Sequence, residues 1–207
     1  MKKLVLTLCL TASTLFAGDD WKILFDGSSL DGWKSNEETP EVFSVTEDGI
    51  LEVRGGRAHL FWMGTDEIPK EFVDFEWQAE VKTSPDANSG IFFHTKFQED
   101  GWPEWGLEAQ VNTSHKGPNK TGSIWGKQNL DTSPVGDSQW YEYSIKVVGK
   151  TVTIRLDGTV VNEYVEPDTP EVSKNRPHVR LGKGTFALQG HDPGCVVHFR
   201  NIRVRSL

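Results

Sequence analysis

One short segment places a carboxylate and two amides at every second position of the chain. Glu108, Gln110 and Asn112 alternate there with apolar residues, and a period of two puts the three polar side chains on one face of a β-strand. On the concave face of a curved sheet they would form a polar floor, whose amides and carboxylate suit the hydroxyl groups of a sugar. The same spacing describes the solvated face of an edge strand, and spacing alone leaves both interpretations open.

A second polar cluster follows Gln189, where the sequence reads Gly-His-Asp-Pro-Gly over residues 190–194. A strand that runs out through Gln189 would place the His191 imidazole and the Asp192 carboxylate at the mouth of a turn. Such a pair can ligate a metal ion or transfer protons. In the alternative interpretation Asp192 bonds its own backbone ahead of Pro193, as in an Asx turn. The two interpretations do not exclude each other.

His94 is a third candidate. It is out of phase with Ile91 and Phe93, so in a regular strand it shares a face with Phe92 and Lys96. A lone histidine is more often a surface or structural residue than a catalytic one.

Trp102, Trp105 and Trp125 lie in or beside Gly- and Pro-rich segments rather than in the middle of a strand. Exposed aromatic rings beside a polar groove are suited to stacking on the C–H faces of sugars. Packing in the core is the alternative role for any of them.

The elements that would position these residues are strands. Period-two alternation dominates the chain, and no stretch of helical length shows a period of 3.6. The clearest run is 72–82, where Val73, Phe75, Trp77, Ala79 and Val81 are predicted to face one way. Turn signals at 149–150 and 157–158 predict two hairpins. Further strands are expected near 50–54, 58–62, 89–97, 106–112, 141–147, 152–156, 159–165, 184–190 and 195–205, and residues 166–183 as a long surface loop. About a dozen short strands predict an all-β, two-sheet antiparallel sandwich of jelly-roll type.

Composition excludes several classes of protein. The formal net charge of −8 argues against nucleic-acid binding, and no apolar run is long enough for a membrane span. The sequence lacks the P-loop, G-x-S-x-G, HExxH and Cys-rich metal motifs. We therefore expect no nucleotide or organic cofactor.

The first residues resemble an export signal. Lys2 and Lys3 precede an uncharged apolar run that ends at Ala17, which predicts a signal peptide over residues 1–17 and a single mature domain over 18–207. The mature chain would be periplasmic or extracellular. Cys195 would be its only cysteine, so no internal disulfide is expected.

Six sets of residues along the chain form a recognisable series. They are 24–33 (LFDGSSLDGW), 88–91 (NSGI), 108–111 (EAQV), 121–126 (TGSIWG) with Trp140-Tyr141, 186–194 (FALQGHDPG) and 199–204 (FRNIRV). In this order, over Trp21 to Leu207, they resemble the 3-keto-disaccharide hydrolase family. The chain carries Trp125 where members of that family usually carry tyrosine, so any role of that hydroxyl is missing here.

The resemblance implies a concanavalin A-like sandwich that hydrolyses glycosides whose sugar has first been oxidised to a 3-keto form by a partner oxidoreductase. A ketone at C3 acidifies the hydrogen on C2, so a base can remove it, the C1 substituent can leave, and water can add to the enone. Such a site also needs a cation or hydrogen-bond donors at the developing enolate oxygen, and a divalent metal ion could supply this stabilisation. The implied roles are Glu108 as base or metal ligand, His191 as acid/base or second metal ligand, Asp192 as the orienter of His191, and sugar binding by His94, Gln110, Asn112, Trp125 and Gln189.

The alternative function is a non-catalytic, lectin-like carbohydrate-binding module, because this kind of sandwich serves both purposes. A binding module does not require a glutamate, a histidine and an aspartate grouped in one groove. Convergence of Glu108, His94 and His191 would therefore favour the enzyme. A laminarinase-type glucanase is disfavoured, since its Glu-x-Asp-x-x-Glu strand is absent.

Overall fold

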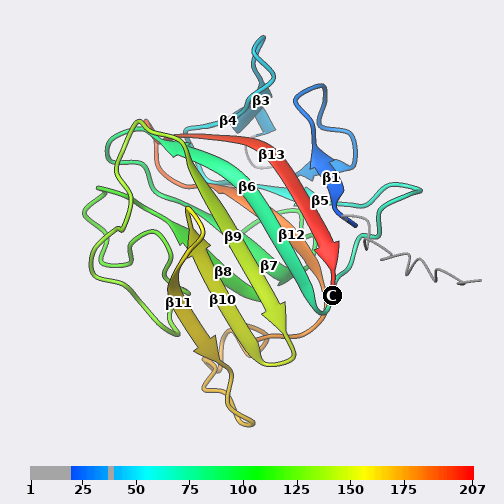
Figure 1. Ribbon diagram of the computed structural model, residues 1–207, viewed down its shortest axis with the longest axis vertical. Coiled ribbons are helices and arrows are strands. Elements are labelled where there is room, and N and C mark those ends of the chain that lie inside the picture. Colours follow the sequence, from blue (N-terminus) through cyan, green and yellow to red (C-terminus); the bar gives the residue numbers. More distant parts are fainter. Residues whose placement is uncertain (1–19, 37–39) are drawn as a thin grey trace, which may run out of the picture.

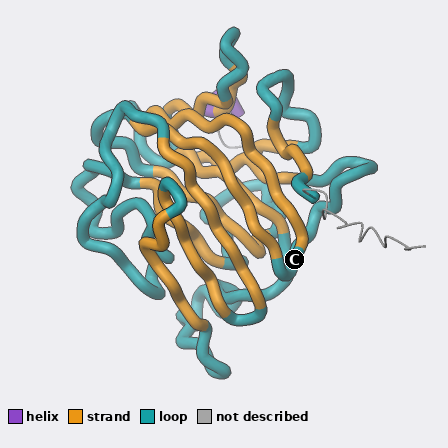
Figure 2. Tube along the Cα trace, viewed as in Figure 1, coloured by secondary structure: helices purple, strands orange, loops and turns teal. Residues whose placement is uncertain are grey.

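The computed structural model describes residues 20–36 and 40–207. The predicted signal peptide, residues 1–17, lies outside the described residues. Two antiparallel sheets pack face to face, with loops gathered around their margins (Figures 1 and 2). The all-β jelly-roll sandwich expected from the alternation is confirmed. Within the described part of the chain, no helix has both the length and the apolar character needed to cross a membrane.

The larger sheet has the strand order β11-β10-β9-β6-β13-β4-β3, with β1 also paired to β13. The smaller sheet has the order β2-β5-β12-β7-β8. The strands are β1 (Lys22–Phe25), β2 (Trp33–Ser35), β3 (Phe43–Val45), β4 (Leu51–Arg54), β5 (Ala58–Trp62), β6 (Phe75–Thr83), β7 (Ser89–Thr95), β8 (Leu107–Val111), β9 (Tyr141–Val148), β10 (Thr151–Leu156), β11 (Thr159–Val165), β12 (Thr185–Gly190) and β13 (Val196–Ser206), and a 3-10 turn, η1 (Pro40–Val42), precedes β3.

The core lies between the two sheets and is built by the period-two pattern. In β6 the side chains of Phe75, Trp77, Ala79 and Val81 are all buried, as predicted. Val73 is 53% exposed, so its predicted place in this row is wrong. The strand begins only at Phe75. Side chains before that residue therefore need not alternate between the two faces of the sheet.

The smaller sheet has one face toward the core and one face outward. Ile91, Phe93, Ala109 and Leu188 belong to the main core cluster. Their neighbours in β7, β8 and β12, one residue along each strand, therefore point to the opposite, outer face. This outer face carries the polar residues that the sequence singled out.

Candidate functional site

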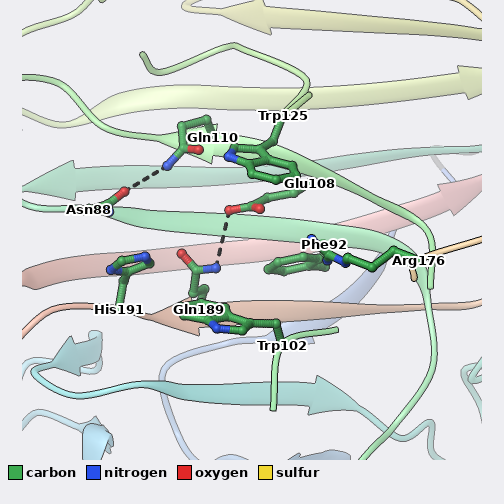
Figure 3. A pocket seen from close by; sticks show the side chains of 9 residues that line it. All are labelled: Asn88, Phe92, Trp102, Glu108, Gln110, Trp125, Arg176, Gln189 and His191. Atoms are coloured by element: carbon green, nitrogen blue, oxygen red, sulfur yellow. Dashed lines mark hydrogen bonds between the residues drawn. The ribbon is translucent and has the colours of Figure 1, made fainter. Parts of the chain in front are cut away.

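A pocket of about 220 Å³ opens on the outer face of the smaller sheet. Its floor comes from β7, β8 and β12, and loops supply its walls (Figure 3). The lining residues are Asn88, Phe92, Trp102, Glu108, Gln110, Trp125, Arg176, Gln189 and His191. Five of the eight predicted site residues therefore come together here, namely Glu108, Gln110, Trp125, Gln189 and His191.

Strand pairing explains how the floor is assembled. In the register of β7 and β8, Phe92 lies opposite Glu108 and Gly90 lies opposite Gln110. The Glu108 side chain lies over Gly90: a Cβ atom at position 90 would be 2.9 Å from Cγ and Cδ of Glu108, and closer still to its Oε1. The missing side chain of Gly90 thus provides the space that the carboxylate occupies.

Glu108 is the ionisable group at the centre of this floor. Burial raises its pKa to about 7, against the opposing effects of the Arg176 charge and of a hydrogen bond from Gln189. The Gln189 amide Nε2 donates that bond to Oε1 over 3.3 Å (Figure 3). A carboxylate with a pKa near 7 can take up a proton and release it again at neutral pH.

Gln110 is held in a fixed orientation beside Glu108. Its Nε2 donates to Oδ1 of Asn88 and to the carbonyl of Ser89, both over 2.9 Å. Its amide is thus tied to the neighbouring strand β7 at the edge of the pocket (Figure 3).

His191 lies at the pocket wall and is in contact with Asp192. Nδ1 of His191 is 2.9 Å from Oδ2 of Asp192, and the same oxygen accepts a 3.3 Å hydrogen bond from Nδ2 of Asn88. Nε2 of His115 lies 3.7 Å from this Oδ2 atom of Asp192. Burial by itself raises the pKa of Asp192, but its contacts with His191, Asn88 and His115 hold it below the ordinary value. Asp192 is therefore a carboxylate placed to orient the His191 ring.

Two aromatic rings form walls on either side of the floor in Figure 3. Trp125 is 41% exposed and Trp102 is 38% exposed. The Trp102 ring centroid lies 4.9 Å from that of His191. The backbone N–H of Trp125 donates to the carbonyl of Glu108, so the loop that carries Trp125 is fixed directly to strand β8.

Asn112 does not line the pocket, contrary to its expected place in the polar row. Strand β8 ends at Val111, and the Asn112 side chain turns into the following loop. There Nδ2 donates to the carbonyls of Gly117 and Asn119, over 3.3 and 2.8 Å. Its observed contacts organise the loop rather than the pocket.

His94 is also outside the pocket, and its predicted face is wrong. Its backbone has a φ of 55°, which breaks the alternation and turns the ring toward Phe75 and Phe93 in the core. Nε2 lies 2.8 Å from the Val73 carbonyl, and the Gly182 N–H donates to Nδ1 over 3.2 Å. These contacts define a neutral ring with its proton on Nε2.

We expect His94→Ala to destabilise the protein by about 3 kcal/mol, because it removes a buried ring and two hydrogen bonds. Burial lowers the pKa of His94 despite the Val73 carbonyl and Asp74. The stability that depends on its neutral form is present above the ordinary pKa of about 6.5 and is lost as the pH falls below it. Urea unfolding of both proteins at pH 5 and pH 8 measures this. An unchanged free energy of unfolding together with weaker sugar binding would instead support the sugar-binding role.

Four pocket residues were not among the predicted site residues. Trp102 was noted only as one of several loop tryptophans, and Asn88 and Phe92 only within a motif or strand. Arg176 was missed entirely, because it lies in the long loop of residues 166–183, where no periodicity indicates which side chain points inward. Arg176 is half-buried and lines the pocket, although it lies more than 60 positions after Glu108 in the sequence.

The donor set of the pocket does not fit a resident divalent cation. Within residues 20–36 and 40–207, no three His, Cys, Asp or Glu side chains are grouped so as to hold a metal ion. The pocket offers one carboxylate and one imidazole among amides, and the nearby Arg176 charge opposes a further cation. We therefore assign no chemical step to a metal.

The sandwich, with its polar pocket walled by tryptophans on one sheet face, defines a protein of the concanavalin A-like jelly-roll class. Within this class the chain belongs to the family of the 3-keto-alpha-glucoside-1,2-lyase-like domain, whose model matches residues 20–205. The family resemblance read from the six sets of residues is thereby confirmed.

Solved structures of similar fold include two candidate glycosyl hydrolases of Parabacteroides distasonis ATCC 8503. One has a TM-score of 0.74 at 20% identity and covers 91% of this chain and 94% of its own. The other has a TM-score of 0.68 at 26% identity and covers 90% and 99%. The carbohydrate-binding module CBM66 of Bacillus subtilis has a TM-score of 0.58 at 16% identity and covers 84% and 96%. A search of curated protein sequences gives no significant match.

Proposed function

We propose that this protein cleaves 3-keto glycosides by removing the proton on C2, eliminating the C1 substituent and hydrating the product. The observation that carries the proposal is Glu108, the single carboxylate among the described residues that line the pocket, whose pKa is about 7. Ordinary glycosidases use two carboxylates on opposite sides of the glycosidic bond. One carboxylate suits a reaction in which the substrate's own ketone makes the C2 hydrogen acidic.

The proposed steps use two groups of the pocket. Ionised Glu108 takes the C2 proton, and the electron pair of that C–H bond forms the C2–C3 double bond of an enolate. As the C3 carbonyl re-forms, the C2–C3 electron pair shifts to make the C1–C2 double bond of the enone. The C1–O bond breaks with its electron pair on oxygen, and His191 gives a proton to that departing oxygen. Water then adds across C1 and C2 of the enone, with its hydroxyl on C1 and a proton on C2. The products are an alcohol and a free 3-keto sugar.

The remaining pocket residues supply binding and orientation. Gln110, Gln189 and Asn88 present amides to sugar hydroxyl groups, and the Trp125 and Trp102 rings offer stacking surfaces. Asp192 orients His191 through the contact with Nδ1. The similarity to candidate glycosyl hydrolases of P. distasonis supports a glycoside substrate.

The reaction needs an oxidised substrate and a location where that substrate is formed. A separate oxidoreductase must supply the substrate, since the C3 hydroxyl has to be oxidised before C2 becomes acidic. Export by way of residues 1–17 would place the enzyme where glycans are degraded.

A carbohydrate-binding module is the second candidate, favoured by the similarity in fold to CBM66. His94 does not join Glu108 and His191, so the convergence that would favour the enzyme is incomplete. The raised pKa of Glu108 supports the enzyme, because a proton-transfer step gains from a carboxylate poised near pH 7 and sugar binding alone does not.

We expect the purified chain to release the alcohol from a 3-keto glucoside and to leave the unoxidised glucoside intact. His191→Ala should lower the rate by about 10²-fold where the departing alcohol is poorly acidic, and much less with 4-nitrophenol, which needs no acid. Release can be followed by chromatography, with and without a chelator. Loss of activity with the chelator would show that a divalent metal ion takes part in the reaction. Saturable glycan binding without cleavage of either glucoside would favour the binding module.

A further inference from the structure

The groups of the pocket lie in a definite order. In Figure 3, His191 is at one end, Glu108 and Gln189 are in the middle, and Arg176 is at the other end. In the substrate of the proposed function, the glycosidic oxygen on C1, the hydrogen on C2 and the oxygen on C3 follow one another in the same way. With His191 at the C1 oxygen and Glu108 at C2, the C3 oxygen points toward the end of the pocket formed by Arg176.

We propose that Arg176 is a catalytic residue, the cation that stabilises the C3 oxyanion of the enolate. This inference rests on the proposed function and supplies the group that the resemblance would assign to a metal ion. Among the pocket-lining residues in the described part of the chain, Arg176 is the one with a permanent positive charge. Its guanidinium donates hydrogen bonds without losing its own proton.

The guanidinium of Arg176 is held in place by contacts outside the floor. Nη2 donates to the carbonyl of Pro103 over 2.8 Å, and Cζ lies 5.6 Å from the centre of the Trp125 ring. The first contact occupies one of the five N–H donors that an arginine carries. Further donors are available on the same planar group for an oxyanion in the pocket.

The loop that carries Arg176 is itself anchored on both sides. The His178 and Trp105 rings stack with their centroids 3.7 Å apart and their planes 2° from parallel, and the Gly106 N–H donates to the His178 carbonyl. At the base of the loop, the Leu181 N–H donates to Oε2 of buried Glu166 over 2.8 Å. The loop therefore positions Arg176 before a substrate binds, which is the condition for effective stabilisation of a developing charge.

The charge moves in the direction that Arg176 favours. Before the reaction the negative charge is on Glu108 in the middle of the pocket. When Glu108 takes the C2 proton, that charge passes through the C2–C3 electron pair to the C3 oxygen, at the Arg176 end. An interaction that strengthens as the enolate forms accelerates the step, whereas one that is equal in both states only aids binding.

The test compares Arg176→Gln and Arg176→Lys with Lys174→Gln, a matched change of an exposed cation on the same loop. For a 3-keto glucoside we expect kcat to fall about 10³-fold in Arg176→Gln, about 10-fold in Arg176→Lys, and not at all in Lys174→Gln. Exchange of the C2 hydrogen with D₂O should slow by the same factors. The acid limb of the pH profile of Arg176→Gln should move to higher pH, because Glu108 loses a favourable charge.

If Arg176→Gln folds poorly, chemical rescue of a second variant provides an independent test. Millimolar guanidinium chloride should restore exchange and turnover to Arg176→Gly and leave the wild type unaffected. A kcat of Arg176→Gln within threefold of the wild type would overturn the inference, as would an absence of rescue in a folded Arg176→Gly. A wild type without activity on 3-keto glucosides is a different result, since it removes the proposed function and the inference with it.

Discussion

Glu108→Gln is expected to lower turnover of a 3-keto glucoside by about 10³-fold while the fold is kept. Glutamine has nearly the same shape as the glutamate and can still contact Gln189, but it cannot accept a proton from C2. In the wild type, kcat/KM should rise with pH until Glu108 is ionised, with the limb centred near its pKa of about 7. Initial rates between pH 5 and 9 for both proteins measure the two effects.

The same substitution has an expected effect on stability, and its sign follows from the raised pKa. Glu108 has an ordinary pKa of 4.5 and a folded pKa of about 7, so its contribution to stability is full below pH 4.5 and is lost as the pH rises through 7. Glu108→Gln should avoid this loss and be more stable than the wild type at pH 8, by at most about 3 kcal/mol. At pH 4 the two proteins should unfold alike.

Glu163→Gln is the matched control for both measurements, since Glu163 is an exposed residue of β11 in the larger sheet and does not line the pocket. It should change neither activity nor stability. If Glu108→Gln retained more than a tenth of the wild-type kcat, Glu108 would not be the base.

Gly90→Ala is expected to lower kcat by about 10²-fold without unfolding the protein. The added Cβ would lie 2.9 Å from Cγ and Cδ of Glu108, a distance that forces the glutamate side chain aside. The carboxylate is the end of a flexible chain, so it can move at little cost to the fold. A displacement of the order of 1 Å is nonetheless enough to cost about two orders of magnitude in rate.

The control for Gly90→Ala is Gly182→Ala, where an added Cβ meets no atom within 4 Å. Both variants should show wild-type circular dichroism and nearly unchanged melting temperatures. Only Gly90→Ala should lose activity, chiefly in kcat. Full activity in Gly90→Ala would mean that the position of the carboxylate over Gly90 is not the catalytic one.

Strands such as β4, β6 and β13 were predictable because they bury alternate side chains more deeply than the residues between them, and that rule is local. Val148 and Thr151 flank the turn expected at residues 149–150, and the turn at 157–158 joins β10 to β11, with φ values of 48° and 76°. The alternation mispredicted the side-chain direction of two residues whose backbone is not that of a regular extended strand. Val73 precedes the strand that was expected to include it, and His94 has a positive φ that no pattern of residue types reveals.

The pocket was predictable in part for the same reason. Glu108 and Gln110 share a face within one strand, so alternation alone places them together. That Gln189 reaches Glu108 depends on the order β12-β7-β8, which the sequence does not state. Arg176 and Trp102 reach the pocket from loops, whose paths are set by single contacts such as the bond from Arg176 to the Pro103 carbonyl.

The last strand of the chain lies in the interior of the larger sheet, between β6 and β4, and also pairs with β1. During synthesis these three strands lack their common partner until Val196–Ser206 has left the ribosome. The larger sheet therefore cannot close before β13 has left the ribosome, and the pairing of Phe25 with Ile202 joins its first strand to its last. Contacts of such long range make folding slow. Folding of the larger sheet therefore waits until β13 has been synthesised, and a chaperone can bind the unfinished sheet until then.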